Sequence, residues 1–188
     1  MPVRRLITAL ALAAALGGCG KERTKAPDVA TPGPPLGSNA SSFPAAGLEF
    51  AAPAGWDLQP GTPPLVATIT TGRATIAVYR YPRTEPLPRT KGELDDAAAA
   101  LAGAALQRDT TYKELARGRL EVDGKPAVVL RATETVGDQP RTVRSTHVYA
   151  FDGEVVVDAF APAADFKRVD EEAFRPFVRS LMLSKPAG

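Results

Sequence analysis

The stretch that decides the fold covers residues 112–161, YKELARGRLEVDGKPAVVLRATETVGDQPRTVRSTHVYAFDGEVVVDAFA. Three dipeptides within it are typical of tight turns: Asp123-Gly124, Gly137-Asp138 and Asp152-Gly153. Two-residue hairpin turns need positive φ angles, which Gly and Asp adopt more readily than other residues. The turns separate four segments rich in β-forming residues, so the stretch predicts an antiparallel meander of four strands.

A helix precedes this meander. Residues 90–106 open with the pattern Thr90-x-x-Glu93, a capping box in which each residue bonds to the other's backbone N–H. Apolar side chains then recur at helical spacing on one face. They are Leu94, Ala97, Ala98, Leu101 and Ala105.

Further short β segments precede the helix, and a second helix follows the meander. The segments 47–50 and 55–58 flank a Pro-x-Gly turn and resemble a hairpin, and residues 65–71 and 73–81 alternate as strands do. After Pro162 a helical pattern continues to about Leu183, and Pro176 should kink or shorten that helix. The order predicts an α+β domain over residues 43–188, an antiparallel β-sheet of about six to eight strands packed by two main helices.

The first eighteen residues have the composition of a signal peptide. Arg4 and Arg5 precede an apolar run, residues 6–16, that spans only about 16 Å as a helix, half of a bilayer core. The next four residues, Leu16-Gly17-Gly18-Cys19, resemble the bacterial lipobox. That resemblance implies a lipid on Cys19 and removal of residues 1–18. Two alternatives stay open: an incidental cysteine after an ordinary signal peptide, and export by the twin-arginine rather than the general route.

Residues 19–42 contain Pro, Ser and Gly and lack aromatic side chains. Such a segment buries too little apolar surface to order itself, so we predict a flexible linker from the lipidated cysteine to the domain. The expected location is the cell membrane on its extracytoplasmic face, or the outer membrane if the cell has one.

Charge and residue counts exclude several classes of function. The chain has 23 Lys and Arg against 21 Asp and Glu, and loss of Arg4 and Arg5 leaves 21 of each. A neutral chain lacks the cationic excess that nucleic-acid binding requires. One Cys and one His cannot form an internal disulfide or complete a zinc site. We therefore expect no metal and no cofactor.

The single histidine is the main candidate for chemistry. His147 lies in the middle of a predicted strand, and Ser145 would share its face. A hydrolase would need a polar cluster around His147, and the sequence contains no nucleophile elbow and no phosphate-binding loop. We interpret His147 as a hydrogen-bonded strand residue and predict no catalytic residues.

Aromatic and basic residues, together with His147, are the candidates for contacts with a ligand or partner. Trp56 is interpreted as a core or edge plug, with ligand stacking as the alternative. Tyr79, Tyr81 and Arg83 fit either an edge strand kept polar against aggregation or a partner-contact rim.

Three packing motifs resemble the PsbP-like α/β/α sandwich. They are GLEFAAPAGW (47–56), the turn Gly124-Lys125-Pro126-Ala127 and FRPFVRSLML (174–183), and the likeness runs from Phe43 to Leu183. It is greatest for the lipoprotein branch, which includes the LpqN lipoproteins. Because members of that group are assembly factors, binding partners and envelope lipoproteins, the resemblance implies no catalytic centre and carries over no functional residue except Cys19.

These observations predict a membrane-anchored lipoprotein whose extracytoplasmic domain is a non-catalytic binding or accessory module for an envelope protein or a small ligand. The alternatives are an envelope enzyme, hydrolase-like, that uses a polar cluster around His147, and a structural lipoprotein with no discrete ligand.

Overall fold

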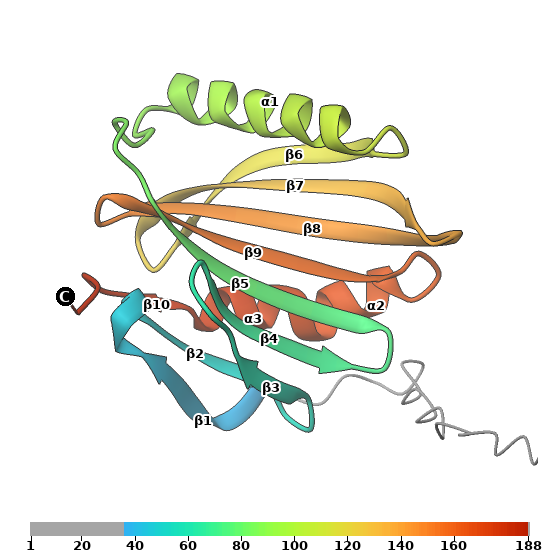
Figure 1. The fold of residues 1–188 in the computed structure, drawn as a ribbon, viewed down its shortest axis with the longest axis horizontal. Helices are drawn as coiled ribbons and strands as arrows, with labels where there is room; N and C mark the ends of the chain where they lie inside the picture. Colours follow the sequence, from blue (N-terminus) through green and yellow to red (C-terminus); the bar gives the residue numbers. More distant parts are fainter. Residues whose placement is uncertain (1–35, 188) are drawn as a thin grey trace, which may run out of the picture.

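The computed structural model describes residues 36–187. Its centre is a seven-stranded antiparallel sheet with the order β3-β4-β5-β9-β8-β7-β6 (Figure 1). The predicted meander forms one half of this sheet. The strand bounds are β3 (Asp57–Pro60), β4 (Leu65–Thr71), β5 (Ala74–Pro82), β6 (Lys113–Val122), β7 (Lys125–Val136), β8 (Gln139–Ala150) and β9 (Gly153–Pro162).

Two of the predicted turns have the expected geometry and the third is shifted by one residue. Positive φ angles occur at both residues of Asp123-Gly124 and of Gly137-Asp138. At the β8–β9 turn they occur at Phe151 and Asp152 instead. A Cβ on Gly153 would lie 2.7 Å from the Arg80 guanidinium, so a larger residue there would require the Arg80 side chain to shift.

A smaller sheet contains β1 (Leu36–Phe43), β2 (Leu48–Pro53) and β10 (Met182–Leu183), with the 3-10 turn η1 (Pro44–Ala46) between the first two strands. Two expectations differ from this arrangement. Residues 36–42, predicted as linker, pair with β2, because an edge strand can be held by backbone bonds without an apolar face. The segments around Pro53-Ala54-Gly55 form no hairpin: β2 pairs with β1 and β10, whereas β3 pairs with β4.

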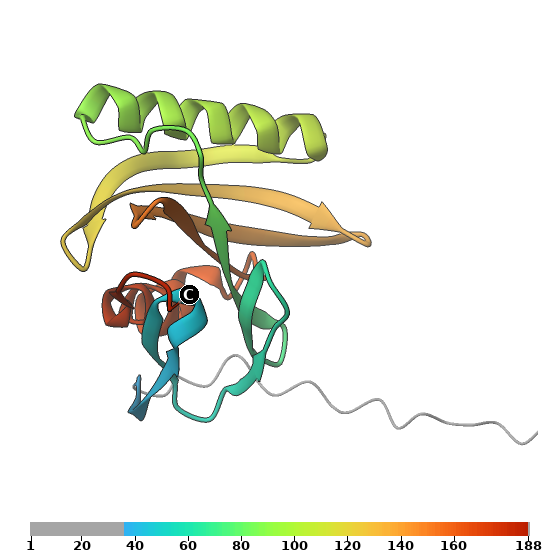
Figure 2. The ribbon, with the colours of Figure 1, turned by 60° about the vertical axis from the view of Figure 1, so that its left-hand side comes forward.

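Helices cover both faces of the large sheet, as Figure 2 shows. Helix α1 (Lys91–Arg108) lies on one face and packs mainly against β6 and β7. Both halves of the predicted capping box are present at its start. The other face is covered by α2 (Phe166–Val169), the π-helical turn η2 (Asp170–Phe174) and α3 (Arg175–Ser180). The backbone stays helical from α2 to α3, and the π-helical turn lies just before Pro176, which is in the first turn of α3 and has no N–H to donate.

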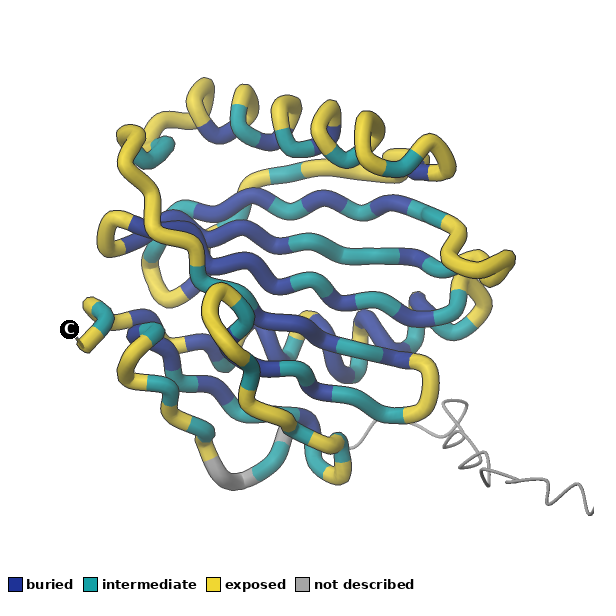
Figure 3. Tube along the Cα trace, in the orientation of Figure 1, coloured by how far each residue is buried: buried dark blue, intermediate teal, exposed yellow. Residues whose placement is uncertain are grey.

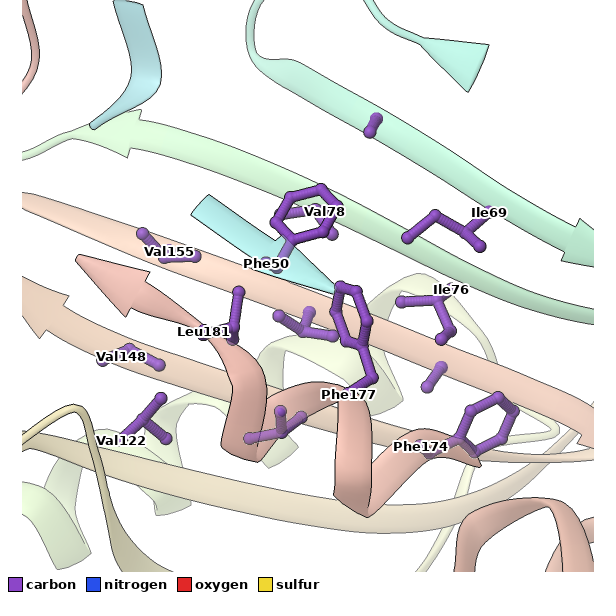
Figure 4. Close-up of a cluster of buried hydrophobic side chains, with 14 of the residues drawn as sticks. Phe50, Ile69, Ile76, Val78, Val122, Val148, Val155, Phe174, Phe177 and Leu181 are labelled. Atoms are coloured by element: carbon purple, nitrogen blue, oxygen red, sulfur yellow. The ribbon is translucent and has the colours of Figure 1, made fainter. Parts of the chain in front are cut away.

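The main core lies between the large sheet, the small sheet and the α2–α3 segment. Phe50, Ile76, Phe174 and Phe177 are fully buried there (Figure 4). A second, smaller cluster joins Leu94 and Ala98 of α1 to β7. Figure 3 shows buried residues along the strands of the large sheet and on the inner side of α1, whereas the outer face of α1 is exposed.

Within residues 36–187 no helix has both the length and the apolar character needed to cross a bilayer.

Candidate functional site

The side chains that could recognise a ligand lie in a groove between α1 and the large sheet. Because α1 lies over β6 and β7, it leaves a groove of about 540 Å³ beneath the C-terminal half of the helix. Pockets that hold small organic ligands have volumes of about 300–1,000 Å³. The roof includes Leu101 and Ala105 of α1, and Tyr79 and Tyr81 of β5 line the groove from the sheet.

The floor of the groove is set by the register of two central strands. Alternate residues of a strand share a face, so Ser145 and His147 of β8 point to the groove together with Glu154 and Asp158 of β9. The cross-strand pairs Ser145 with Asp158 and His147 with Val156 bring these four side chains together. All four are buried or half-buried.

The four side chains form one hydrogen-bonded chain. The Ser145 hydroxyl donates to Asp158 Oδ1 at 2.5 Å, and Ser145 Oγ lies 2.9 Å from His147 Nε2. On the other side of the ring, His147 Nδ1 lies 2.6 Å from Glu154 Oε1. Arg83 Nη1 closes the chain by donating to Glu154 Oε2 at 2.8 Å.

The tautomer of His147 decides how the two contacts of its ring are made. The Ser145 hydroxyl has one proton, which it donates to Asp158. A neutral imidazole donates at one ring nitrogen and accepts at the other, and a protonated imidazole donates at both. The ring therefore joins Ser145 on one side to Glu154 on the other.

Glu154 is held in its ionised form. Burial alone would raise the pKa of this carboxyl, but the hydrogen bond and charge of His147 and the charge of Arg83 outweigh burial and lower it below 4.5. The neighbouring phenol shows the opposite shift, since burial and then the negative charge of Glu154 raise the pKa of Tyr149.

The lowered pKa of Glu154 predicts how stability depends on pH. A depressed native pKa contributes stability above the unfolded-state value, and that contribution is lost as the pH falls through the native pKa. Glu154→Gln is expected to cost about 2 kcal/mol of unfolding free energy at neutral pH, since it removes hydrogen bonds to charged groups. The gap between wild type and variant should shrink below pH 4.5, as measured by urea unfolding across a pH series.

Glu85→Gln is the matched control. Glu85 also pairs with Arg83, at 3.6 Å, but its side chain is 70% exposed. We expect almost no change from this substitution, because exposed ion pairs contribute little. A gap for Glu154→Gln that stays constant below pH 4.5 would contradict the argument.

The structure gathers most, but not all, of the predicted contact residues. Tyr79, Tyr81 and His147 line the groove, and Arg83 lies beside it through its bond to Glu154. Trp56 lies elsewhere, packed edge-on against Phe174 of the main core at 6.2 Å. Cys19, the predicted lipidation site, lies outside the described residues.

The predicted edge position of residues 79–83 requires a correction. Strand β5 is internal, between β4 and β9, so most of it has two paired neighbours. The pairing with β4 ends at Tyr79, however, and Tyr81 and Pro82 pair with β9 alone. Only the tip of the strand is an edge, and it borders the groove.

Ser145, His147 and Glu154 have the order of a serine, a base and an orienting carboxylate. Three features differ from a working nucleophile. The Ser145 hydroxyl donates to Asp158 rather than to His147. The residue lies inside a strand paired on both sides, and no sharp turn presents its hydroxyl. Two free backbone N–H groups of the kind that form an oxyanion hole are not offered by such a paired strand. The arrangement is therefore better suited to binding than to acyl transfer.

Comparison with known proteins identifies the fold. No protein-family model matches the chain, and no curated protein sequence matches it. Solved structures do match it. CyanoP, the cyanobacterial PsbP of Synechocystis, has a TM-score of 0.61 at 15% identity and covers 90% of this chain and 99% of its own.

Two further matches have different roles. LpqN of Mycobacterium tuberculosis, which is involved in cell envelope biogenesis, has a TM-score of 0.55 at 14% identity over 73% of this chain and 83% of LpqN. The Ran-binding protein Mog1p of Saccharomyces cerevisiae has 0.57 at 12% identity, over 80% of this chain and 97% of Mog1p. Because such low identities establish the fold alone, we conclude that this chain has a PsbP-like fold, the α/β/α sandwich that its packing motifs predict.

Proposed function

We propose that the chain is a lipid-anchored extracytoplasmic lipoprotein and that its domain is a binding or accessory module whose ligand occupies the groove beneath α1. The observation that carries the proposal is the groove itself. It combines a volume of about 540 Å³ with aromatic walls and four convergent polar side chains on its floor. A concave, partly apolar site with a few fixed polar groups is the usual form of a binding site.

The anchoring part of the proposal has separate support. Residues 16–19 have the lipobox pattern after a signal-peptide-like segment. One structural neighbour, LpqN, is involved in cell envelope biogenesis. A lipid on Cys19 would keep the groove close to a membrane, where an envelope component could reach it.

Site-specific photo-crosslinking tests whether the groove is occupied in the cell. Leu101 lines the groove from α1, whereas Leu115 of β6 is 52% exposed and does not line it. With p-benzoyl-phenylalanine at position 101, we expect one defined adduct in irradiated envelopes, identified by mass spectrometry. The same group at position 115 should give none. Equal adducts at both positions, or an adduct at 115 alone, would argue against a ligand in the groove.

An envelope hydrolase is the second candidate, favoured by the contacts of His147 with Ser145 and Glu154. For hydrolysis, the Ser145 proton would have to turn from Asp158 to an unprotonated His147 Nε2 when substrate binds. A fluorophosphonate, which labels activated serines, separates the two functions. Label on Ser145 that is lost in His147→Ala would favour the hydrolase, and no label favours the binding module.

A further inference from the structure

We infer that the groove binds an organic cation, an ammonium or guanidinium group, and that Asp158 is its anionic contact. This inference rests on the proposed function of the groove and names the chemical class of the ligand.

Within residues 36–187, Asp158 differs from Glu134 and Glu154 of the groove because no lysine or arginine pairs with it, and Asp109, which also lines the groove, is bonded by Thr111. Glu134 is bound by Arg141 at 2.5 Å, and Glu154 by Arg83 at 2.8 Å. Among residues 36–187, the Asp158 carboxylate accepts its hydrogen bond from the Ser145 hydroxyl. A half-buried carboxylate gains from a cation that replaces the water it has lost.

The Ser145 hydroxyl donates to Asp158 Oδ1 and also lies 2.9 Å from His147 Nε2, so it connects Asp158 to the rest of the polar floor. No charged side chain is interposed between Asp158 and this hydroxyl. A ligand cation placed against Asp158 would supply directly the positive charge that this carboxylate lacks.

Aromatic side chains complete a site of this kind. Ala77 lies opposite Asp158 on β5, and its small side chain leaves the carboxylate open to the groove. Tyr79 and Tyr81 follow on the same face, with ring centroids 5.9 Å apart and planes 17° apart. Aromatic faces attract cations. Burial first, and then the negative charges of Tyr79, Asp158 and Glu154, raise the pKa of Tyr81, which places the phenol within the field of these carboxylates.

The surroundings favour a cation over an anion. Arg141 is held by Glu134 and lies 4.3 Å over the Phe160 ring, and Arg83 is held by Glu154. Arg108 also lines the groove, from the end of α1, where its side chain is exposed and opposes the rise in the pKa of Tyr81. The titratable and charged groups around His147 and Asp158 are Glu154 from β9, Tyr79 and Tyr81 from β5, Arg83 after β5, Tyr149 and Arg141 from β8, Glu134 from β7, Arg108 and Asp109 at the end of α1, and Tyr112 before β6.

The test compares a cation with its neutral isostere on the full-length wild-type chain. N-acetyl-arginine amide and N-acetyl-citrulline amide have nearly the same shape, but only the first is charged. We expect the arginine probe to bind at least about tenfold more tightly, the change that one charge-assisted contact supplies. The measurement is an NMR titration that follows the His147 ring.

A matched pair of variants locates the contact. Asp158→Asn should lose the preference for arginine over citrulline. Asp152→Asn, an identical substitution in the β8–β9 turn outside the groove, should keep it. Thermal unfolding checks that both variants are folded. Agmatine, a small molecule with a guanidinium group, separates the two sources of the cation. If agmatine binds more tightly than N-acetyl-arginine amide, the ligand is a free small-molecule cation. If it binds more weakly, the ligand is an arginine side chain of a peptide.

The outcomes distinguish this inference from the proposed function. Equal binding of the arginine and citrulline probes, no binding of either, or an arginine preference that persists in Asp158→Asn would overturn the cation site. If the position-101 adduct still forms in that case, the groove remains a binding site for a ligand of another class. If that adduct is also missing, the proposed function fails with the inference.

Discussion

Phe177→Ala is expected to lower the unfolding free energy by about 4 kcal/mol, within the range measured for large-to-small substitutions in cores. The Phe177 side chain on α3 is fully buried between the α2–α3 segment and the small sheet. Its ring meets the Phe50 ring edge-on, with centroids 5.0 Å apart (Figure 4). Alanine would leave a cavity bordered by both sheets, which could close only if an element moved.

Urea unfolding of the full-length chain measures this effect, with Phe151→Ala as the control. Phe151 lies in the β8–β9 turn and is 39% exposed, with the Lys125 ammonium 5.1 Å from its ring centre. This control should cost less than about 1 kcal/mol. A loss of similar size for the two variants would mean that the α3 helix does not form the core layer described here.

Asp170→Ala is expected to cost about 3–4 kcal/mol, the loss seen when one partner of a buried ion pair is removed. Asp170 lies in the π-helical turn and is 2% exposed. Its two oxygens accept from Arg144 Nε at 2.5 Å and Nη2 at 2.9 Å, and Arg175 Nε donates at 2.9 Å. These bonds join the helical layer to the centre of the large sheet, and alanine would leave the half-buried Arg144 without its partner.

Two further variants separate the lost pair from a general disturbance of the turn. Glu171→Ala alters the next residue, which is exposed, and should cost less than about 0.5 kcal/mol. Arg144→Met combined with Asp170→Ala should cost less than Asp170→Ala alone, because the uncompensated charge is gone. A double variant as unstable as the sum of its single variants would show that the ion pair does not couple the two layers.

Local patterns predict much of this fold because they do not depend on distant contacts. The capping box at Thr90 and Glu93 forms as expected, since both partners lie within one turn. The turns at Asp123-Gly124 and Gly137-Asp138 also form as expected, because each depends on its own two residues and not on distant contacts. The Pro176 effect is also local, because it follows from a missing N–H.

The elements that sequence patterns miss depend on long-range pairing. Strand β2 pairs with β10, more than 120 residues later in the chain, and no local signal distinguishes this from a hairpin with β3. Strand β1 lies at the edge of the small sheet and is held by backbone pairing with β2. Its Gly- and Ser-containing composition therefore resembles that of a linker.

In the candidate site, too, the local pattern is predictable from the sequence and the long-range contacts are not. Period-two alternation places Ser145 and His147 on one face and, four residues apart on β9, Glu154 and Asp158 on one face. Two acids on the same face of a Val-rich strand were a signal that the sequence analysis did not use. Their meeting with His147 depends on the β8–β9 register, in which the turn centres on Phe151 and Asp152. The distances that turn these residues into one hydrogen-bonded chain exist only after that register is known.

Photo-crosslinking from position 101 in a chain whose groove is blocked tests the central claim most directly. Ala105→Trp would fill the groove from α1, and Leu106→Trp, on the neighbouring residue whose side chain is 53% exposed, would leave it open. With p-benzoyl-phenylalanine at position 101, the account predicts the same adduct in the unblocked chain and in Leu106→Trp, and its loss in a folded Ala105→Trp. An adduct of undiminished yield in Ala105→Trp would show that the ligand binds elsewhere and would contradict the account.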